Sequence, residues 1–465
     1  MKRLKTELNA LVNRGVDRHL RLAVTGLSRS GKTAFITALV NQLLNIHTGA
    51  RLPLLSAARE ERLLGVKRVP QRDFGIPRFT YDEGLAQLYG QPPMWPTPTR
   101  GVSEIRLALR YRSNDSLLRH FKDTSTLYLE IVDYPGEWLL DLPMLAQDYL
   151  SWSRQMTGLL QGQRAEWSAR WRQLCAGLDP LAPADEARLA DIAAAWTDYL
   201  HACKREGLHF IQPGRFVLPG EMAGAPALQF FPWPDVDAVG EAKLAQADKH
   251  SNAGMLRERY KYYCERVVKG FYKEHFLRFD RQIVLVDCLQ PLNSGPQAFN
   301  DMRLALTQLM QSFHYGQRTL FRRLFSPVID KLLFAATKAD HVTIDQHSNM
   351  VSLLQQLIQD AWQNAAFEGI SMDCLGLASV QATTSGIIDV NGEKIPALRG
   401  NRLSDGAPLT VYPGEVPARL PGQAFWDKQG FQFEAFRPQV MDVDKPLPHI
   451  RLDAALEFLI GGKLR

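Results

Sequence analysis

Apolar runs alternate with helical patterns along most of this chain, and their order predicts an α/β fold. Residues 20–24, LRLAV, read as a buried strand, and the apolar positions after residue 32 recur at helical spacing. Later apolar runs within 281–292, 330–342 and 373–385 are typical of central strands in a parallel sheet. Because helical patterns separate these runs, we predict a mostly parallel, doubly wound sheet.

Two neighbouring segments predict an antiparallel pair beside the first strand. In 101–113 apolar positions alternate with charged ones, which is typical of a half-exposed strand. Residues 125–138 hold a second apolar run that ends in a turn. The preceding segment, 45–96, is rich in Pro, Arg and Gly and offers only short helical stretches. We therefore expect an excursion there and not a domain.

Amphipathic helical patterns dominate between about residues 141 and 280. One of them, 255–279, mixes aromatic with basic residues, a combination that also suits stacking on nucleic acid. Its residues Tyr263, Val267 and Phe271 recur at helical spacing, which favours a stripe packed against a core. We therefore expect no specific nucleic-acid partner.

The alternation of strands and helices is lost in the last part of the chain. Residues 386–448 carry turn signals between short strand-like pieces, so we expect a small β-rich excursion there. Leu452, Leu456 and Leu459 recur at helical spacing and predict a C-terminal helix within 449–465.

Composition places the chain among ordinary soluble proteins. Apolar residues make up 45% of its 465 residues and charged residues 22%, and the net charge of +6 is modest for this length. No run approaches the 18 or so apolar residues of a membrane span, and the N-terminus lacks the apolar region of a secretory signal. The five cysteines lie far apart without metal spacing, as reduced thiols do. These features predict a cytoplasmic protein.

The first twenty residues form a pattern with two interpretations. Leu4, Leu8 and Leu11 recur at helical spacing among basic residues. Such an amphipathic helix commonly packs on its own protein, but it also suits the surface of an anionic membrane. A peripheral location at the inner membrane therefore stays open.

The segment from Gly26 to Thr33 has the pattern GxxxxGKT of a phosphate-binding loop, placed as required between a strand and a helix. Gly26 and Gly31 permit backbone angles and close approaches that a Cβ would block. Successive N–H groups then point at phosphate oxygens, and the helix adds its positive N-terminal end. Lys32 reaches the β- and γ-phosphates, and the Thr33 hydroxyl is suited to bind Mg²⁺. The other residues expected to line the phosphates are Leu27, Ser28, Arg29, Ser30 and Ala34.

A second motif, DxxG, follows the strand within 125–138. Asp133 would hold Mg²⁺ through a water, and the Gly136 N–H would sense the γ-phosphate. Thr97 and Thr99 precede the strand within 101–113, and either could complete the metal site. We favour Thr99.

The third motif is Thr337-Lys338-Ala339-Asp340, directly after an apolar strand. The Asp340 carboxylate can accept hydrogen bonds from guanine N1–H and the 2-amino group, a donor pair that adenine lacks. The stem of Lys338 can cover the base. After the next strand, the backbone N–H groups of Ala378, Ser379 and Val380 are candidates for the guanine oxygen.

GxxxxGKT, DxxG, TKxD and ASV in this order are similar to the motif set of Ras-like GTPases. Over nearly the whole chain, and most specifically in the phosphate loop and in YPGEWLLDLP, the sequence resembles the bacterial YcjX family of stress-induced GTPases. The resemblance implies a Ras-like fold with a large helical insertion after the second switch, and GTP or GDP as the ligand. It also implies membership of the phage-shock stress response.

The sequence departs from the Ras-like pattern in ways that bear on catalysis. Thr337 replaces the usual Asn, which weakens the link between the base site and the phosphate loop. Glu137 stands where many such enzymes have a water-orienting Gln; an ionised Glu only accepts hydrogen bonds, so we expect slow hydrolysis without a partner. Arg29 or Arg100 could neutralise charge in cis, although either also suits an ordinary surface position. We take Lys32, Thr99 and Glu137 as the catalytic candidates.

These observations predict a Mg²⁺-dependent GTPase switch whose helical insertion reads the nucleotide state. Its rivals are a P-loop ATPase or kinase and a nucleotide-dependent scaffold with little turnover. A protein partner is expected, a membrane protein being one option. The expected division is an amphipathic helix in 1–20, nucleotide-domain halves in 21–140 and 281–385, a helical insertion in 141–280, the β-rich excursion in 386–448 and the final helix in 449–465.

Overall fold

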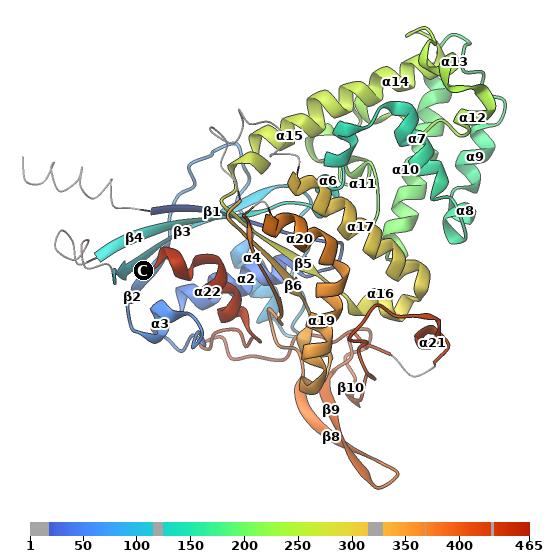
Figure 1. Cartoon of the computed structure of the whole chain (residues 1–465). Coiled ribbons are helices and arrows are strands. Elements are labelled where there is room, and N and C mark those ends of the chain that lie inside the picture. Colours follow the sequence, from blue (N-terminus) through green and yellow to red (C-terminus); the bar gives the residue numbers. More distant parts are fainter. Residues whose placement is uncertain (1–17, 115–123, 315–328, 368, 429–431) are drawn as a thin grey trace, which may run out of the picture. The chain divides into compact units, whose positions relative to one another are not determined.

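The computed structural model describes residues 18–114, 124–314, 329–367, 369–428 and 432–465 (Figure 1). The chain divides into two compact units. The first comprises Met1–Tyr134, Phe279–Pro296 and Pro327–Arg465, and the second comprises Pro135–Arg278 and Gln297–Ser326.

The first unit is built on a seven-stranded mixed sheet in the order β2-β3-β4-β1-β5-β6-β7. Strands β4, β1, β5, β6 and β7 are mutually parallel, and β2 and β3 add an antiparallel edge. The mostly parallel α/β sheet expected from the apolar runs is therefore confirmed. Its strands are β1 (Arg18–Gly26), β2 (Leu63–Arg68), β3 (Ser103–Arg112), β4 (Thr124–Asp133), β5 (Arg281–Val286), β6 (Lys331–Ala336) and β7 (Ser371–Gly376).

The antiparallel edge confirms one expectation and corrects another. β3 and β4 pair antiparallel, with Ser103 opposite Asp133, and β4 lies next to β1. The segment 45–96 is more than an excursion, because its β2 extends the main sheet along β3. This strand is short and contains Gly65 and two basic residues, so only its pairing partner decides its conformation. The expected N-terminal helix lies outside the described residues except for 18–20, which belong to β1.

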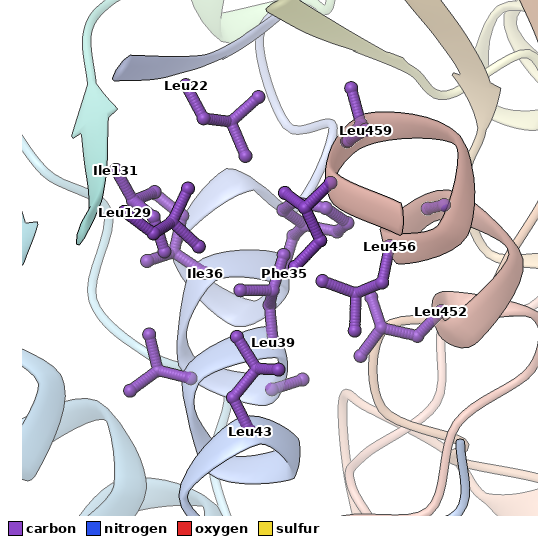
Figure 2. Packing of buried hydrophobic residues seen from close by; sticks show 14 of the residues in the cluster. Leu22, Phe35, Ile36, Leu39, Leu43, Leu129, Ile131, Leu452, Leu456 and Leu459 are labelled. Atoms are coloured by element: carbon purple, nitrogen blue, oxygen red, sulfur yellow. The ribbon is translucent and has the colours of Figure 1, made fainter. Parts of the chain in front are cut away.

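The main core lies between the sheet and two helices that are far apart in the sequence. Figure 2 shows Phe35 and Leu39 of α2 (Lys32–Leu44) facing Leu452 and Leu456 of α22 (Leu452–Ile460), below Leu22 of β1. All five side chains are buried. The predicted C-terminal helix is confirmed, and its leucine stripe fixes the helix against α2 by burying apolar area.

Smaller elements complete the first unit. The turn-rich C-terminal region forms a separate antiparallel sheet in the order β10-β9-β8, which confirms a small β-rich part. Its strands are β8 (Thr384–Val390), β9 (Glu393–Asn401) and β10 (Pro408–Val411). The helices and helical turns are α3 (Ser56–Arg59), α4 (Tyr81–Leu88), α16 (Leu289–Ser294), η6 (Ala339–His341), η7 (Ile344–Gln346), α19 (His347–Leu357), α20 (Gln359–Phe367), α21 (Gln423–Trp426) and η8 (Gly461–Lys463).

The second unit is helical in its described part. The expected aromatic stripe is confirmed, since Tyr263, Val267 and Phe271 are all buried, but the helix that carries it contains a π-helical segment that periodicity does not predict. The elements are α6 (Gly136–Leu139), η1 (Leu142–Ala146), α7 (Tyr149–Gly158), α8 (Gln163–Trp167), α9 (Ala169–Cys175), α10 (Glu186–Arg205), α11 (Gly214–Val217), η2 (Gly220–Met222), η3 (Pro226–Leu228), α12 (Val236–Val239), α13 (Glu241–Ala245), α14 (Asn252–Tyr262), η4 (Tyr263–Val268), α15 (Lys269–Glu274), η5 (Phe276–Arg278) and α17 (Pro296–His314).

Two further observations concern the cysteines and the lengths of the helices. All five cysteines are free thiols and are buried. Within the described part of the chain, no helix combines the length and the apolar character needed to cross a bilayer.

Candidate functional site

The predicted motifs of the first unit follow strands whose carboxyl ends lie at one edge of the sheet. β1 ends at Gly26, β4 at Asp133, β5 at Val286, β6 at Ala336 and β7 at Gly376. These ends are in register, because each strand pairs in parallel with its neighbour close to its last residue. In open α/β sheets this edge is where ligands bind.

The loop between β1 and α2 has a backbone that glycine makes possible. A Cβ at Gly26 would collide with Ser30 Oγ and would lie 2.6 Å from the carbonyl oxygen of Leu285. Gly31 has a φ of 84° and Arg29 a φ of 63°, so two left-handed residues flank the buried Ser30. Alternation of this kind turns neighbouring N–H groups toward one side and forms a concavity for an anion.

The other loop residues divide into polar groups near the surface and buried supports. Lys32 and Ser28 are half-buried and Arg29 is exposed, whereas Leu27 and Ala34 are buried. Thr33 is buried in the first turn of α2, and its carbonyl oxygen accepts a hydrogen bond from Thr37 Oγ1 at 2.8 Å. The N–H groups of this first turn have no carbonyl partner inside the helix, which suits an anion at its N-terminus.

Thr99 and Asp133 are brought together. The Thr99 hydroxyl donates a hydrogen bond to Oδ2 of the fully buried Asp133. Thr97 is held elsewhere, because its hydroxyl accepts a hydrogen bond from Gln87 Nε2 and its N–H donates to Gln87 Oε1, both at 2.9 Å. Arg100, the other arginine considered for charge neutralisation, is exposed.

Lys338 adopts a left-handed backbone and forms an ion pair with Asp287, the residue that follows β5. Lys338 Nζ lies 2.6 Å from Asp287 Oδ2, and Thr337 is anchored to the same strand end by its N–H, which donates to the Val286 carbonyl. Burial would raise the pKa of the Asp287 carboxyl. The Lys338 ammonium and the N–H groups of Leu289 and Gln290 outweigh that effect and hold the pKa below its ordinary value.

Asp340 is buried and already makes hydrogen bonds with both of its oxygens. Oδ2 accepts the N–H of Ala382 at 2.7 Å, and Oδ1 lies 3.0 Å from His341 Nδ1. Burial favours the neutral acid, yet the neighbouring His341 and the backbone donors lower the pKa of Asp340. A carboxylate has about four lone-pair positions, so an ionised Asp340 retains capacity to accept a further donor.

The segment after β7 is pinned to the C-terminal region. The Ala378 N–H donates to the Ile450 carbonyl at 3.0 Å, and the Ile450 N–H donates back at 2.9 Å. The Ala378 N–H is therefore already engaged. Of the three residues expected near the guanine oxygen, Ser379 is half-buried and Val380 is buried.

Gly136 and Glu137 belong to the second unit, in α6. Glu137 is buried, and its Oε1 lies 2.8 Å from Lys204 Nζ at the end of α10. The next residue, Trp138, donates from Nε1 to the Leu218 carbonyl at 3.1 Å, and the Arg215 guanidinium lies 3.3 Å from its ring centroid. The residues after DxxG are thus bound by helical elements of their own unit.

Three residues with ionisable side chains were missed in the sequence. Asp287 had a signal, because it is an acidic residue directly after the buried run of β5, where ligand-facing groups collect. His341 and Lys204 had none, since their contacts with Asp340 and Glu137 depend on the folded chain.

Comparison with known proteins gives a consistent result. The model of the family described as "YcjX-like family, DUF463" matches residues 20–464. The chain is 93% identical over 465 residues to a protein of Escherichia coli (strain K12) named "Ras-like GTPase YcjX", with all of both chains covered. It is 46% identical over 478 aligned positions to a protein of the same name from Shewanella oneidensis, covering the whole chain and 98% of that relative.

Proposed function

The chain belongs to the YcjX-like family, and on that premise we propose that it binds and hydrolyses GTP as a Ras-like switch protein. The observation that carries the proposal is the common edge of the sheet. There Asp133 ends β4, and the Gly26–Thr33 loop and the Thr337–Asp340 segment lie at the ends of β1 and β6, which are parallel strands of the same sheet. The names of the two relatives support the same activity.

Phosphate binding is assigned to the loop after β1. The left-handed residues Arg29 and Gly31 and the start of α2 supply N–H groups, and Lys32 supplies a mobile positive charge. The close approach of the chain at Gly26, which leaves no room for a Cβ, supports a loop shaped around a ligand.

The residues present fit Mg²⁺, which prefers oxygen ligands. Thr33, Thr99 and Asp133 offer two hydroxyls and a carboxylate, and the Thr99–Asp133 hydrogen bond supports a shared role. We propose that Thr33 and Thr99 bind the ion and that Asp133 orients its ligands. Bound there, Mg²⁺ would neutralise phosphate charge.

Base choice is assigned to Asp340. Its lowered pKa keeps the carboxylate ionised at neutral pH, and the ionised form can accept a hydrogen bond from the donor pair of guanine. Lys338, steadied by Asp287, would cover the base, and Ser379 or Val380 would offer a backbone donor to the guanine oxygen. An ATPase would leave Asp340 facing a base without that donor pair, at a cost of about 1–3 kcal/mol.

Turnover is expected to be slow without a partner. Lys32 and Thr99 would stabilise charge at the γ-phosphate, and Glu137 would act on the attacking water. A carboxylate at this position is repelled by phosphate and cannot donate a hydrogen bond to it. A scaffold that binds GTP and scarcely hydrolyses it is therefore the second candidate.

We propose residues 141–280 as the part that reads the nucleotide state for a protein partner, inserted between nucleotide-domain halves in 21–140 and 281–385. The dense contacts of Trp138 within the second unit support this role. A place in a bacterial stress response, in the cytoplasm or peripherally at the inner membrane, belongs to the same proposal, as does a membrane protein as partner.

The test is phosphate release by the purified full-length protein with GTP or ATP, each with Mg²⁺ and with EDTA. We expect slow, Mg²⁺-dependent release from GTP and little from ATP. If the protein prefers ATP to GTP, the proposal is wrong and the protein is better described as a P-loop ATPase. Tight GTP binding without release, even after addition of cell extract, would favour the scaffold.

A further inference from the structure

The side chain of Glu137 is held away from solvent by a lysine from another helix of the second unit. Lys204 Nζ lies 2.8 Å from Glu137 Oε1, and the two side chains are 27% and 7% exposed, respectively. Lys204 lies in the last turn of α10, and Glu137 lies in α6. The contact therefore joins two residues that lie 67 positions apart in the sequence.

The backbone of Glu137 is fixed by the same region. A Cβ at Gly214 would collide with the carbonyl oxygen of Glu137, so α11 lies directly against this residue. The Gly214 N–H donates to both oxygens of the buried Asp141, at 2.8 and 3.0 Å. Tyr263 Oη donates to Asp141 Oδ2 at 2.6 Å from the π-helical segment. Glu137 therefore cannot change its surroundings without disturbing α10 or α11.

Separating the two charges of an ion pair with so little exposure to solvent is unfavourable. Removing the partner of a buried charge leaves it uncompensated, so an ionised Glu137 prefers to stay beside Lys204. The Oε1 atom that faces Lys204 is engaged, and the low exposure of the side chain limits the access of water to the carboxylate.

We propose that Lys204 is a positioning residue that withholds Glu137 from the attacking water, so that the end of α10 sets the rate of hydrolysis. The inference rests on the proposed GTPase function. In the reaction, a water oxygen forms a bond to the γ-phosphorus while the bond to the bridging oxygen breaks and leaves GDP. The water proton passes to the Glu137 carboxylate, which releases it afterwards. Glu137 is a weaker proton acceptor while it is paired with Lys204, because the ammonium stabilises the ionised carboxylate.

A partner or a nucleotide-driven movement that displaces the end of α10 would therefore accelerate turnover. The rate of hydrolysis would then be controlled by the helical unit. A movement of α10 would change the rate by changing the pairing of Glu137. In the opposite arrangement, Lys204 would hold Glu137 in the position where it acts on the attacking water. Removal of the lysine would then lower kcat, and the test below distinguishes the two arrangements.

The test is steady-state GTP turnover of the full-length wild type and of Lys204→Ala, with GDP affinity measured in parallel. We expect kcat to rise on the order of tenfold while KM and GDP affinity stay unchanged, because in this proposal the lysine acts only through Glu137. Lys204→Arg retains the ion pair and should keep the wild-type rate. The matched control is Arg205→Ala, which removes the same charge from the neighbouring residue, whose partner is Glu206.

A double-mutant cycle separates the proposal from a general loosening of α10. In a Glu137→Gln background there is no ion pair to open, so Lys204→Ala should leave kcat unchanged. A lower kcat in Lys204→Ala, an equal rise in Arg205→Ala, or the same rise in the Glu137→Gln background would each overturn the inference. These results leave the proposed function standing, which fails if the wild type prefers ATP or releases no phosphate from GTP.

Discussion

The hydroxyl of Thr99 donates a hydrogen bond to Oδ2 of Asp133, which joins the loop before β3 to the last residue of β4. The antiparallel pairing of β3 and β4 brings the two together, because Ser103 lies opposite Asp133 and Thr99 precedes Ser103 by one short loop. Thr97 is bound to Gln87 instead. The relationship separates Thr99, which the sequence analysis favours, from Thr97.

Thr99 and Thr97 form a matched pair for testing the metal site. Thr99→Ala removes a hydroxyl from the proposed Mg²⁺ site, and we expect Mg²⁺-dependent GTP affinity to fall on the order of tenfold. Thr97→Ala should change it little, because its hydroxyl bonds to Gln87. Binding of a non-hydrolysable GTP analogue, titrated against Mg²⁺, decides the matter. Equal losses in both variants would exclude the assignment of Thr99.

Asp340→Asn tests the choice of base. The amide replaces one acceptor by a donor that faces guanine donors, so guanine affinity should fall by about 1–3 kcal/mol. Xanthine, which carries an oxygen in place of the 2-amino group, should gain relative affinity. Competition between GDP and xanthosine diphosphate on wild type and variant measures both effects. Asp345→Asn, an exposed aspartate five positions later, is the control. If GDP affinity is unaltered in Asp340→Asn, Asp340 does not read the base.

The helical unit should respond to the γ-phosphate. A ligand shifts a conformational equilibrium only by binding its states differently, and the extra phosphate with Mg²⁺ supplies that difference. We expect hydrogen exchange in 136–147 and 204–218 to differ between GDP and a non-hydrolysable GTP analogue, by a factor on the order of ten. Mass spectrometry of peptides from these segments measures it. Identical exchange in both states would mean that the insertion is a passive scaffold.

Asp141 should make stability depend on pH. Burial raises the pKa of its carboxyl to about 7, although bonds from Tyr263 and Gly214 favour the ionised form. In the unfolded chain the group ionises near pH 4, so from there to about pH 7 the unfolded state loses a proton that the folded state keeps. The contribution of Asp141 therefore becomes less favourable as pH rises through this window, and is constant above it.

Asp141→Asn removes this titration while keeping a side chain of the same shape. Relative to wild type, the variant should gain stability between pH 4.5 and pH 7.5, on the order of 1 kcal/mol per pH unit within the window. Urea unfolding followed by tryptophan fluorescence at the two pH values measures the difference. Parallel pH dependence in the two proteins would show that Asp141 does not titrate there.

Periodicity predicted the parts of the fold whose own residues determine their burial. The strand β5 is buried throughout and reads as one apolar run, and the leucines of α22 mark its packed face. β2 was not predicted, because its residues are half-buried and its strand conformation depends on pairing with β3. The π-helical segment at Tyr263–Val268 was also unpredictable, because its side chains still follow a helical stripe.

The candidate site shows the same division. The glycine spacing of the loop and the position of Asp133 and Asp340 after strands are local signals and were available from the sequence. Contacts between distant residues were not: the Ala378 bridge to Ile450 and the Glu137 ion pair with Lys204 arise only when the chain folds. These long-range contacts are also the ones that decide which donors and carboxylates are already engaged.

The central claim, that the loop after β1 binds the phosphates of a nucleotide, is tested most directly by Lys32→Ala. Lys32 is half-buried at the start of α2 and supports no core, so the variant should keep its circular dichroism spectrum and melting temperature. Titration with fluorescent GDP should show affinity reduced on the order of a hundredfold. Lys67→Ala, on the exposed part of β2, should bind like wild type. Unchanged GDP affinity in a folded Lys32→Ala protein would contradict the account.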